Sequence, residues 1–60
     1  MIKISVAIIT YNEEDNITRC LQSVKGIADE IVVIDSLSDD KTVQISEKLG
    51  ARVIKRPFPG

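Results

Sequence analysis

The fold is decided by two stretches of sequence, VAIITYNEE at residues 6–14 and EIVVIDSLSDD at residues 30–40. Each begins as a run rich in β-branched residues, ends abruptly in polar residues and is followed by a segment with helical spacing. Parallel strands covered on both faces have this nearly continuous apolar character. In an open α/β sheet, the residues just past the carboxyl ends of the strands line the ligand crevice. We therefore expect the polar clusters Thr10–Glu13 and Asp35–Ser36 to lie side by side in one cleft.

The whole chain reads as β-α-β-α-β. We expect strands at residues 4–10, 31–34 and 51–55, with right-handed crossovers that give a parallel sheet of order 3-2-1. The two intervening segments place apolar and small residues at helical spacing. These stripes consist of Ile17, Cys20, Leu21 and Val24 in the first helix, and Val43, Ile45, Ser46 and Leu49 in the second. The predicted fold class is α/β, one half of a doubly wound parallel sheet.

The helix ends carry recognisable signals. Asn12 or Asp15 is the expected N-cap of the first helix, and a residue within 38–40 is the expected N-cap of the second. Gly26 is expected to end the first helix in the left-handed conformation, and Leu49–Gly50 to close the second.

Composition excludes several classes of protein. The chain has 60 residues, 8 basic and 9 acidic, with a net charge of −1 and no basic face that indicates nucleic acid. It has no histidine and one cysteine, so it offers neither an intrachain disulfide nor a zinc framework. Cys20 lies on an apolar stripe and is expected to be an inert core thiol. No segment resembles a signal peptide or a membrane span, which makes a cytoplasmic location the default.

Sixty residues is small for an independent α/β domain. The sequence also stops at residues 56–60, where a loop containing two prolines begins. We expect residues 1–60 to be the amino-terminal part of a longer domain. Taken alone, the chain is expected to self-associate or to be poorly stable, because its apolar first strand is an exposed edge of the sheet and its small size leaves little stability in reserve.

The first strand-to-helix turn has no glycine, so neither a dinucleotide fingerprint nor a P-loop fits. Three acidic residues at positions 13–15 would repel a pyrophosphate at that helix start. The crevice is therefore expected to hold a base or a sugar there rather than phosphate.

Asp35 is the strongest candidate for a ligand contact, because a carboxylate at the end of a buried strand needs partners. The alternative is that it accepts backbone N–H groups of its own turn. Tyr11 offers a flat face for a base, or it simply covers the edge of the sheet. Glu13 is either a ligand or a helix-start residue. Asp39–Asp40 is read as a cap and a first-turn acid rather than a metal pair, and Lys55–Arg56 as solvated rather than phosphate-binding.

Residues 5–14 and 31–42, with a third strand at 51–54, closely resemble the start of family 2 glycosyltransferases with the GT-A fold. The resemblance implies a transferase that uses a nucleotide sugar, in which Asp35 binds the base, typically uracil. The first strand end, Thr10, Tyr11 and Glu13, would hold the nucleoside. Family members often carry Asp-Asp-Gly-Ser-Thr-Asp at the second motif, where this chain has Ser36 and Leu37 as its second and third residues.

The resemblance also implies a divalent metal, Mg or Mn, with ligands and a general base beyond Gly60. No catalytic or metal-binding residue is therefore assigned, and the isolated chain is expected to be inactive. The Asp-Ser-x-Ser-x-Asp variant, with its later Lys-Arg-Pro-Phe, resembles the subgroup that adds glucose to the lipopolysaccharide inner core. That implies a UDP-sugar donor, an envelope glycan or glycolipid acceptor, and a location in the cytoplasm, at the inner face of the bacterial membrane. The alternatives are a nucleotidyltransferase fragment and a non-catalytic receiver-like module.

Overall fold

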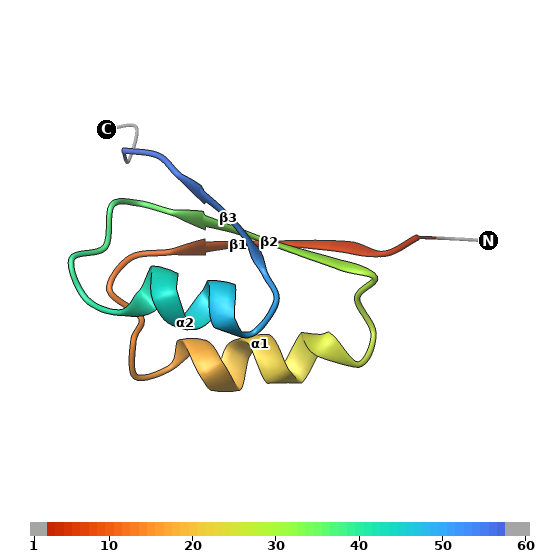
Figure 1. Ribbon diagram of the computed structural model, residues 1–60. Coiled ribbons are helices and arrows are strands. Elements are labelled where there is room, and N and C mark those ends of the chain that lie inside the picture. Colours follow the sequence, from red (N-terminus) through yellow and green to blue (C-terminus); the bar gives the residue numbers. More distant parts are fainter. Residues whose placement is uncertain (1–2, 58–60) are drawn as a thin grey trace.

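The computed structural model describes residues 3–57 and contains the β-α-β-α-β order that the sequence predicts (Figure 1). The elements are β1 (Ser5–Thr10), α1 (Ile17–Lys25), β2 (Glu30–Asp35), α2 (Thr42–Lys48) and β3 (Arg52–Lys55). All strand pairs are parallel, with β2 between β1 and β3, which confirms the predicted order 3-2-1. Of the predicted loop at residues 56–60, only Arg56 and Pro57 lie within the described residues.

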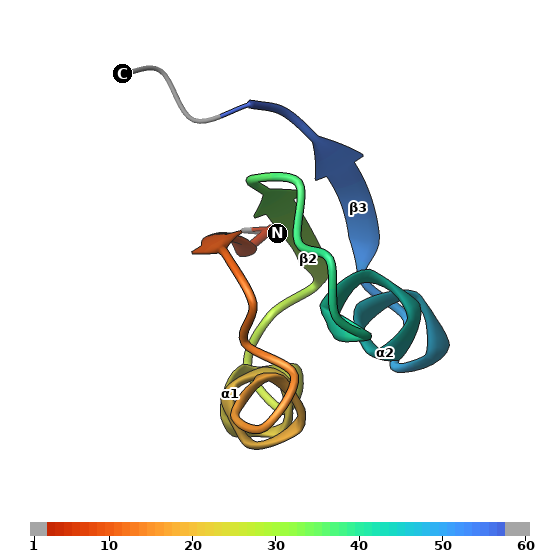
Figure 2. The same ribbon diagram turned by 90° about the vertical axis from the view of Figure 1, so that its left-hand side faces the viewer.

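Both helices lie on the same face of the sheet (Figure 2). Strand register places Ile8, Val33 and Val53 opposite one another, and these side chains pack on the helix side. The core that they join consists of Ile17, Leu21, Val33 and Ala51. Since side chains alternate along a strand, the row Ile9, Ile34 and Ile54 belongs to the other face.

That other face is not covered by a helix within residues 3–57, and Ile9 is 69% exposed there. The expectation that the strands are covered on both faces is therefore wrong for this part of the chain. The reason is that both crossovers place their helix on the same side, so the described elements form two layers.

The first helix begins later than predicted. Its N-cap is Asn16, whose side chain makes no capping bond, and a turn precedes it in which Ile17 N donates to Glu13 O at 2.7 Å. Asn12 and Asp15 are thus wrong as N-caps. Gly26 has φ −76°, so the left-handed ending is also wrong. The chain instead continues in a right-handed turn, with Ala28 N donating to Val24 O at 2.9 Å.

The end of α2 agrees better with the sequence. Gly50 follows the helix with φ 93°, and Ala51 N donates to Ser46 O at 3.0 Å, which closes the last turn. At its start, Asp40 Oδ1 accepts from Thr42 N at 2.9 Å. Asp40 therefore acts as the capping acid within the predicted range 38–40, although the residue before the helix is Lys41.

Cys20 is exposed, and the prediction of a core thiol is wrong. Only Ile17 and Leu21 of α1 are fully buried, so the helix buries a narrow stripe. At 3.6 residues per turn, Cys20 lies about 80° from the centre of that stripe and turns toward solvent.

Candidate functional site

The carboxyl ends of β1 and β2 are joined at Thr10 and Asp35. These two residues are partners in the strand register, and Thr10 Oγ1 donates to Asp35 Oδ1 at 2.8 Å. Ser36 N continues the pairing with a 2.8 Å bond to Thr10 O. Thr10 is 3% exposed and Asp35 0% exposed. The prediction that the two polar clusters lie side by side is confirmed by these bonds.

Asp35 is held by donors from its own turn as well. Ser38 Oγ donates to Asp35 Oδ1 at 2.6 Å, and Ser38 N donates to Asp35 Oδ2 at 2.7 Å. Burial raises the pKa of Asp35, but the bonds from Ser38 and Thr10 outweigh it and hold the pKa below its ordinary value. The alternative role predicted for Asp35, accepting a backbone N–H group of its own turn, is thus present in the structure. A carboxylate accepts at about four positions, which leaves one free acceptor position on Oδ2.

The loops after β1 and β2 are linked by a reciprocal pair of hydrogen bonds. Asn12 N donates to Ser38 Oγ at 2.8 Å, and Asp39 N donates to Asn12 Oδ1 at 3.0 Å. Asn12 adopts φ 47°, in the left-handed region that Asn tolerates better than most residues. Asn12 therefore joins the loops instead of capping α1.

A second set of bonds links the loops farther from the strands. Glu13 N donates to Thr42 Oγ1 at 2.8 Å, and Glu14 N donates to Asp40 Oδ2 at 3.2 Å. In return, Lys41 N donates to Glu14 Oε1 at 3.0 Å. The hydroxyl of Thr42 also donates to Asp40, and this bond is the largest of the effects that lower the pKa of Asp40.

The remaining predicted site residues present their side chains outward. Tyr11 is 56% exposed and Glu13 is also exposed. The sequence analysis missed the linking roles of Ser38 and Thr42. Ser38 had a weak signal, because the carboxylate of an Asp at a turn accepts backbone N–H groups of that turn, most often two residues on. Thr42 had none, since its partner Glu13 lies 29 residues away.

A cavity of about 440 Å³ opens between the loop after β2, helix α2 and the end of β3. Its lining is Asp35, Leu37, Ser38, Asp39, Asp40, Val43, Gln44, Glu47 and Lys55. Thr10, Tyr11 and Glu13 do not line it, so this cavity is not the single cleft that the sequence analysis expected. Four carboxylates face one ammonium group there, a balance that disfavours phosphate and favours a ligand with hydrogen-bond donors.

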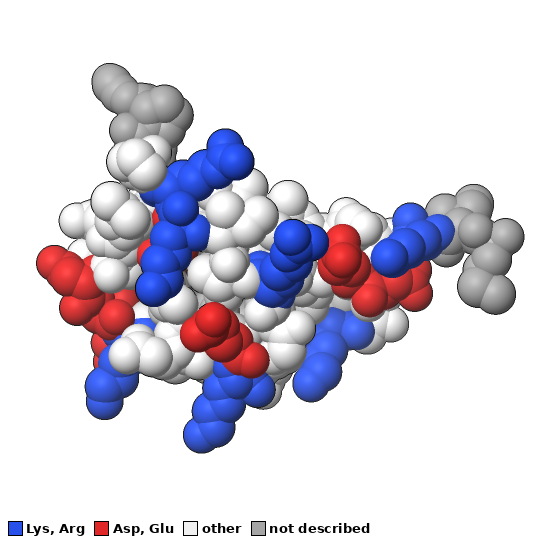
Figure 3. Space-filling view, turned by 45° about the horizontal axis from the view of Figure 1, so that its top comes forward, with Lys and Arg blue, Asp and Glu red and all other residues white. Residues whose placement is uncertain are grey.

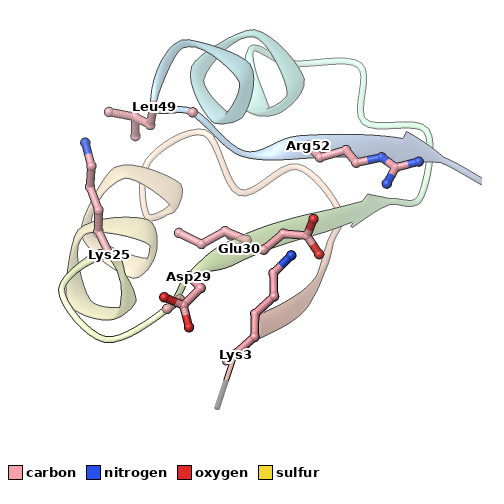
Figure 4. A pocket seen from close by; sticks show the side chains of 9 residues that line it. Lys3, Lys25, Asp29, Glu30, Leu49 and Arg52 are labelled. Atoms are coloured by element: carbon pink, nitrogen blue, oxygen red, sulfur yellow. The ribbon is translucent and has the colours of Figure 1, made fainter. Parts of the chain in front are cut away.

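A second cavity, of about 540 Å³, lies at the opposite end of the strands (Figure 4). Its charged side chains are of both signs and include Lys3, Lys25, Asp29, Glu30 and Arg52. Figure 3 shows the same mixture of acidic and basic side chains over the face that it presents. This mixture indicates a solvated surface rather than a basic patch for nucleic acid.

Two further properties of residues 3–57 concern metals and membranes. No group of three or more His, Cys, Asp or Glu side chains lies in position to hold a metal ion. Both oxygens of Asp40 are engaged by N–H or O–H donors, which fits its reading as a capping acid. No helix in this part of the chain is long and apolar enough to cross a membrane.

Residues 5–60 match the sequence model of the family described as glycosyl transferase family 2. The chain therefore belongs to this family, as its resemblance predicts, and its α/β sheet matches part of a GT-A fold.

Among its relatives is an uncharacterized glycosyltransferase of Rickettsia bellii, 57% identical over 58 residues, which cover 97% of this chain and 20% of the relative. The glycosyltransferase SunS of Bacillus subtilis is 52% identical over 42 residues, 70% of this chain and 10% of that protein. Glucosyl-3-phosphoglycerate synthase of Mycobacterium tuberculosis, solved with Mn²⁺ and UDP-glucose, superposes with a TM-score of 0.79. It is 35% identical, over 88% of this chain and 20% of that one. The chain thus spans about a fifth of the length of the first relatives it matches.

Proposed function

We propose that residues 1–60 form the amino-terminal, nucleoside-binding part of an inverting glycosyltransferase that uses a nucleoside-diphosphate sugar, with uridine as the nucleoside. The observation that carries the proposal is the buried Thr10–Asp35 pair at the adjacent carboxyl ends of β1 and β2. Ligands of open α/β sheets bind outside this edge. Support comes from the solved relative that contains UDP-glucose.

Each proposed nucleotide-binding residue has a distinct role. Asp35 accepts a hydrogen bond from the N3–H of the base with the free position on Oδ2. Thr10 orients that carboxylate through its 2.8 Å bond. Tyr11 and Glu13 lie outside the cavity beside Asp35, so their proposed contacts are with the part of the nucleoside that projects from it. There the exposed ring of Tyr11 covers a flat face of the ligand, and Glu13 accepts from a ribose hydroxyl. Because Asp35 is fully buried in the structure, the base reaches it from the cavity that Leu37 and Lys55 line.

A divalent metal, Mg or Mn, supplies charge that stabilises the leaving diphosphate in such a transfer. Residues 3–57 do not fit a metal site, so we assign its ligands, and the general base that deprotonates the acceptor, to other parts of the enzyme. The residues of this chain bind and orient the nucleoside. The isolated chain is accordingly inactive.

The proposed acceptor is an envelope glycan or lipopolysaccharide core, reached in the cytoplasm at the inner face of the bacterial membrane. The support is the resemblance of the Asp35–Asp40 segment to the subgroup that glucosylates the lipopolysaccharide core. The mixed surface charge supports a glycan or glycolipid over nucleic acid as a partner.

Calorimetric titration of the full-length protein with uridine diphosphate tests the proposal. Uridine diphosphate is expected to bind, adenosine diphosphate to bind at least tenfold more weakly, and inorganic pyrophosphate to bind most weakly. Equal affinity for all three would mean that the site recognises phosphate and not the base. That result would overturn the assignment of Asp35 to the nucleoside.

A further inference from the structure

Leu37 combines an unfavourable backbone conformation with an exposed apolar side chain. Its φ is 59°, in the left-handed region where a side chain is disfavoured and Gly or Asn is preferred. Its side chain is 55% exposed, so burial does little to offset that strain. Strained backbone of this kind is concentrated at ligand sites.

The position of Leu37 is equally specific. It follows Asp35 by two residues and lines the 440 Å³ cavity together with Asp35, Ser38 and Lys55. The cavity falls in the size range of small-molecule sites. Apart from Leu37 and the half-buried Val43, its lining is polar or charged. Leu37 therefore supplies exposed apolar surface beside the carboxylate that we assign to the base.

We propose that Leu37 is a specificity-determining residue that packs against the pyrimidine ring and ribose of the bound nucleoside. This inference rests on the proposed function, because it places the nucleoside in the cavity next to Asp35. An apolar side chain contributes to affinity in proportion to the area that the ligand covers, whereas its strained backbone lowers the stability of the protein. Replacing Leu37 by a residue that tolerates this φ should therefore weaken nucleotide binding without lowering the stability of the protein. The role can be measured because the two quantities respond differently.

The test uses four variants of the full-length protein, titrated with uridine diphosphate and unfolded with heat. Leu37→Asn and Leu37→Gly are expected to weaken binding about five- to tenfold, while their melting midpoints stay equal or rise. Leu37→Met keeps the apolar contact and should bind within about twofold of the wild type. The matched control is Ile27→Asn, at a residue 67% exposed at the other end of the sheet, and its affinity should not change.

Three results would overturn the inference, and they separate it from the proposed function. If Leu37→Asn binds like the wild type, Leu37 does not contact the nucleoside, although the site assignment stands. If Leu37→Asn loses affinity and stability together, the leucine packs within the protein and acts structurally. If the wild type does not bind uridine diphosphate at all, the proposed function fails and the role of Leu37 fails with it.

Discussion

Ser38 Oγ donates a 2.6 Å hydrogen bond to Asp35 and accepts one of 2.8 Å from the backbone N–H of Asn12. One hydroxyl thus fixes the carboxylate of the central strand and fastens it to the loop that follows the neighbouring strand. The proposed site depends on this relay, because Asp35 and Tyr11 belong to the two segments that Ser38 holds together.

Ser38→Ala removes both bonds and leaves a buried carboxylate with fewer donors. We expect a loss of about 1–3 kcal/mol in the free energy of unfolding, measured by urea titration. Ser23→Ala is the control, since Ser23 Oγ donates only to Cys20 O on the exposed side of α1. Equal losses in the two variants would show that the relay does not stabilise the loops.

Asp35→Ala should weaken binding of uridine diphosphate about ten- to a hundredfold, because a hydrogen bond to a charged group contributes roughly 1.5–3 kcal/mol. Asp39→Ala is the comparison variant: its carboxylate lines the same cavity but is exposed, and its loop bond is made by the backbone, so the affinity should change much less. Calorimetry measures both, with circular dichroism to verify folding. If a folded Asp39→Ala lost binding while Asp35→Ala bound normally, the assignment of the nucleoside to Asp35 would be wrong.

Acid should destabilise the protein through Asp35 and Asp40. Their pKa values are lowered from the ordinary value of 3.8 by hydrogen bonds that outweigh burial. The unfolded chain therefore takes up protons first as the pH falls. The contribution of the two carboxylates is complete above about pH 5 and is lost progressively as the pH falls through 3.8 and then through their lower pKa values in the folded state. Urea midpoints between pH 7 and pH 3 should decline in that window, and less steeply in Asp35→Asn. A decline centred near pH 6 would rule out these carboxylates as its source.

The two described glycines within turns should respond oppositely to alanine. Gly50 has φ 93°, so Gly50→Ala is expected to cost about 1 kcal/mol of stability. Gly26 has φ −76° and no atom within 4 Å of an added Cβ, so Gly26→Ala should be neutral or stabilise by about 0.4–1 kcal/mol. Thermal melts of both variants check this. A larger loss at Gly26 than at Gly50 would contradict the described backbone.

The 60-residue chain made alone should self-associate. Its edge strand β1 has unpaired backbone groups, and Ile9 is exposed on the face without helices. Sedimentation velocity should show concentration-dependent species, and Ile9→Lys should shift them toward monomer. Ile27→Lys adds the same charge at a similarly exposed residue in the turn after α1 and should have little effect. A monodisperse wild-type monomer would refute the expectation.

The strands, their order and the proximity of Thr10 to Asp35 were predictable from the sequence, because apolar runs that end in polar residues mark buried strands and their carboxyl ends. The family was predictable from the two motifs at residues 5–14 and 31–42. The sign of φ at Gly26 was not, since glycine is compatible with either hand. The exposure of Cys20 was not predictable either. Helical periodicity locates the centre of the apolar stripe, but it does not say how wide a part of the helix the sheet covers.

The loop contacts of Asn12 were unpredictable for a different reason. Its side chain had a local use, capping α1, and a distant one, accepting from Asp39 N. The distant bond prevailed because the strand register brings the two loops together. The cavity likewise depends on how α2 and β3 flank the loop after β2, which no single motif encodes.

The bonds that join the two loops have a consequence for how the site comes into being. Partners such as Thr10 and Asp35, Asn12 and Ser38, and Glu13 and Thr42 are separated by 25 to 29 positions along the chain. Neither β-α unit alone contains a complete set of these partners, so a peptide of either half should lack the proposed nucleoside site. The ability to bind the nucleoside should therefore appear in one step, when β1 pairs with β2. Ligand binding would then measure the tertiary folding of the chain and not the formation of its helices.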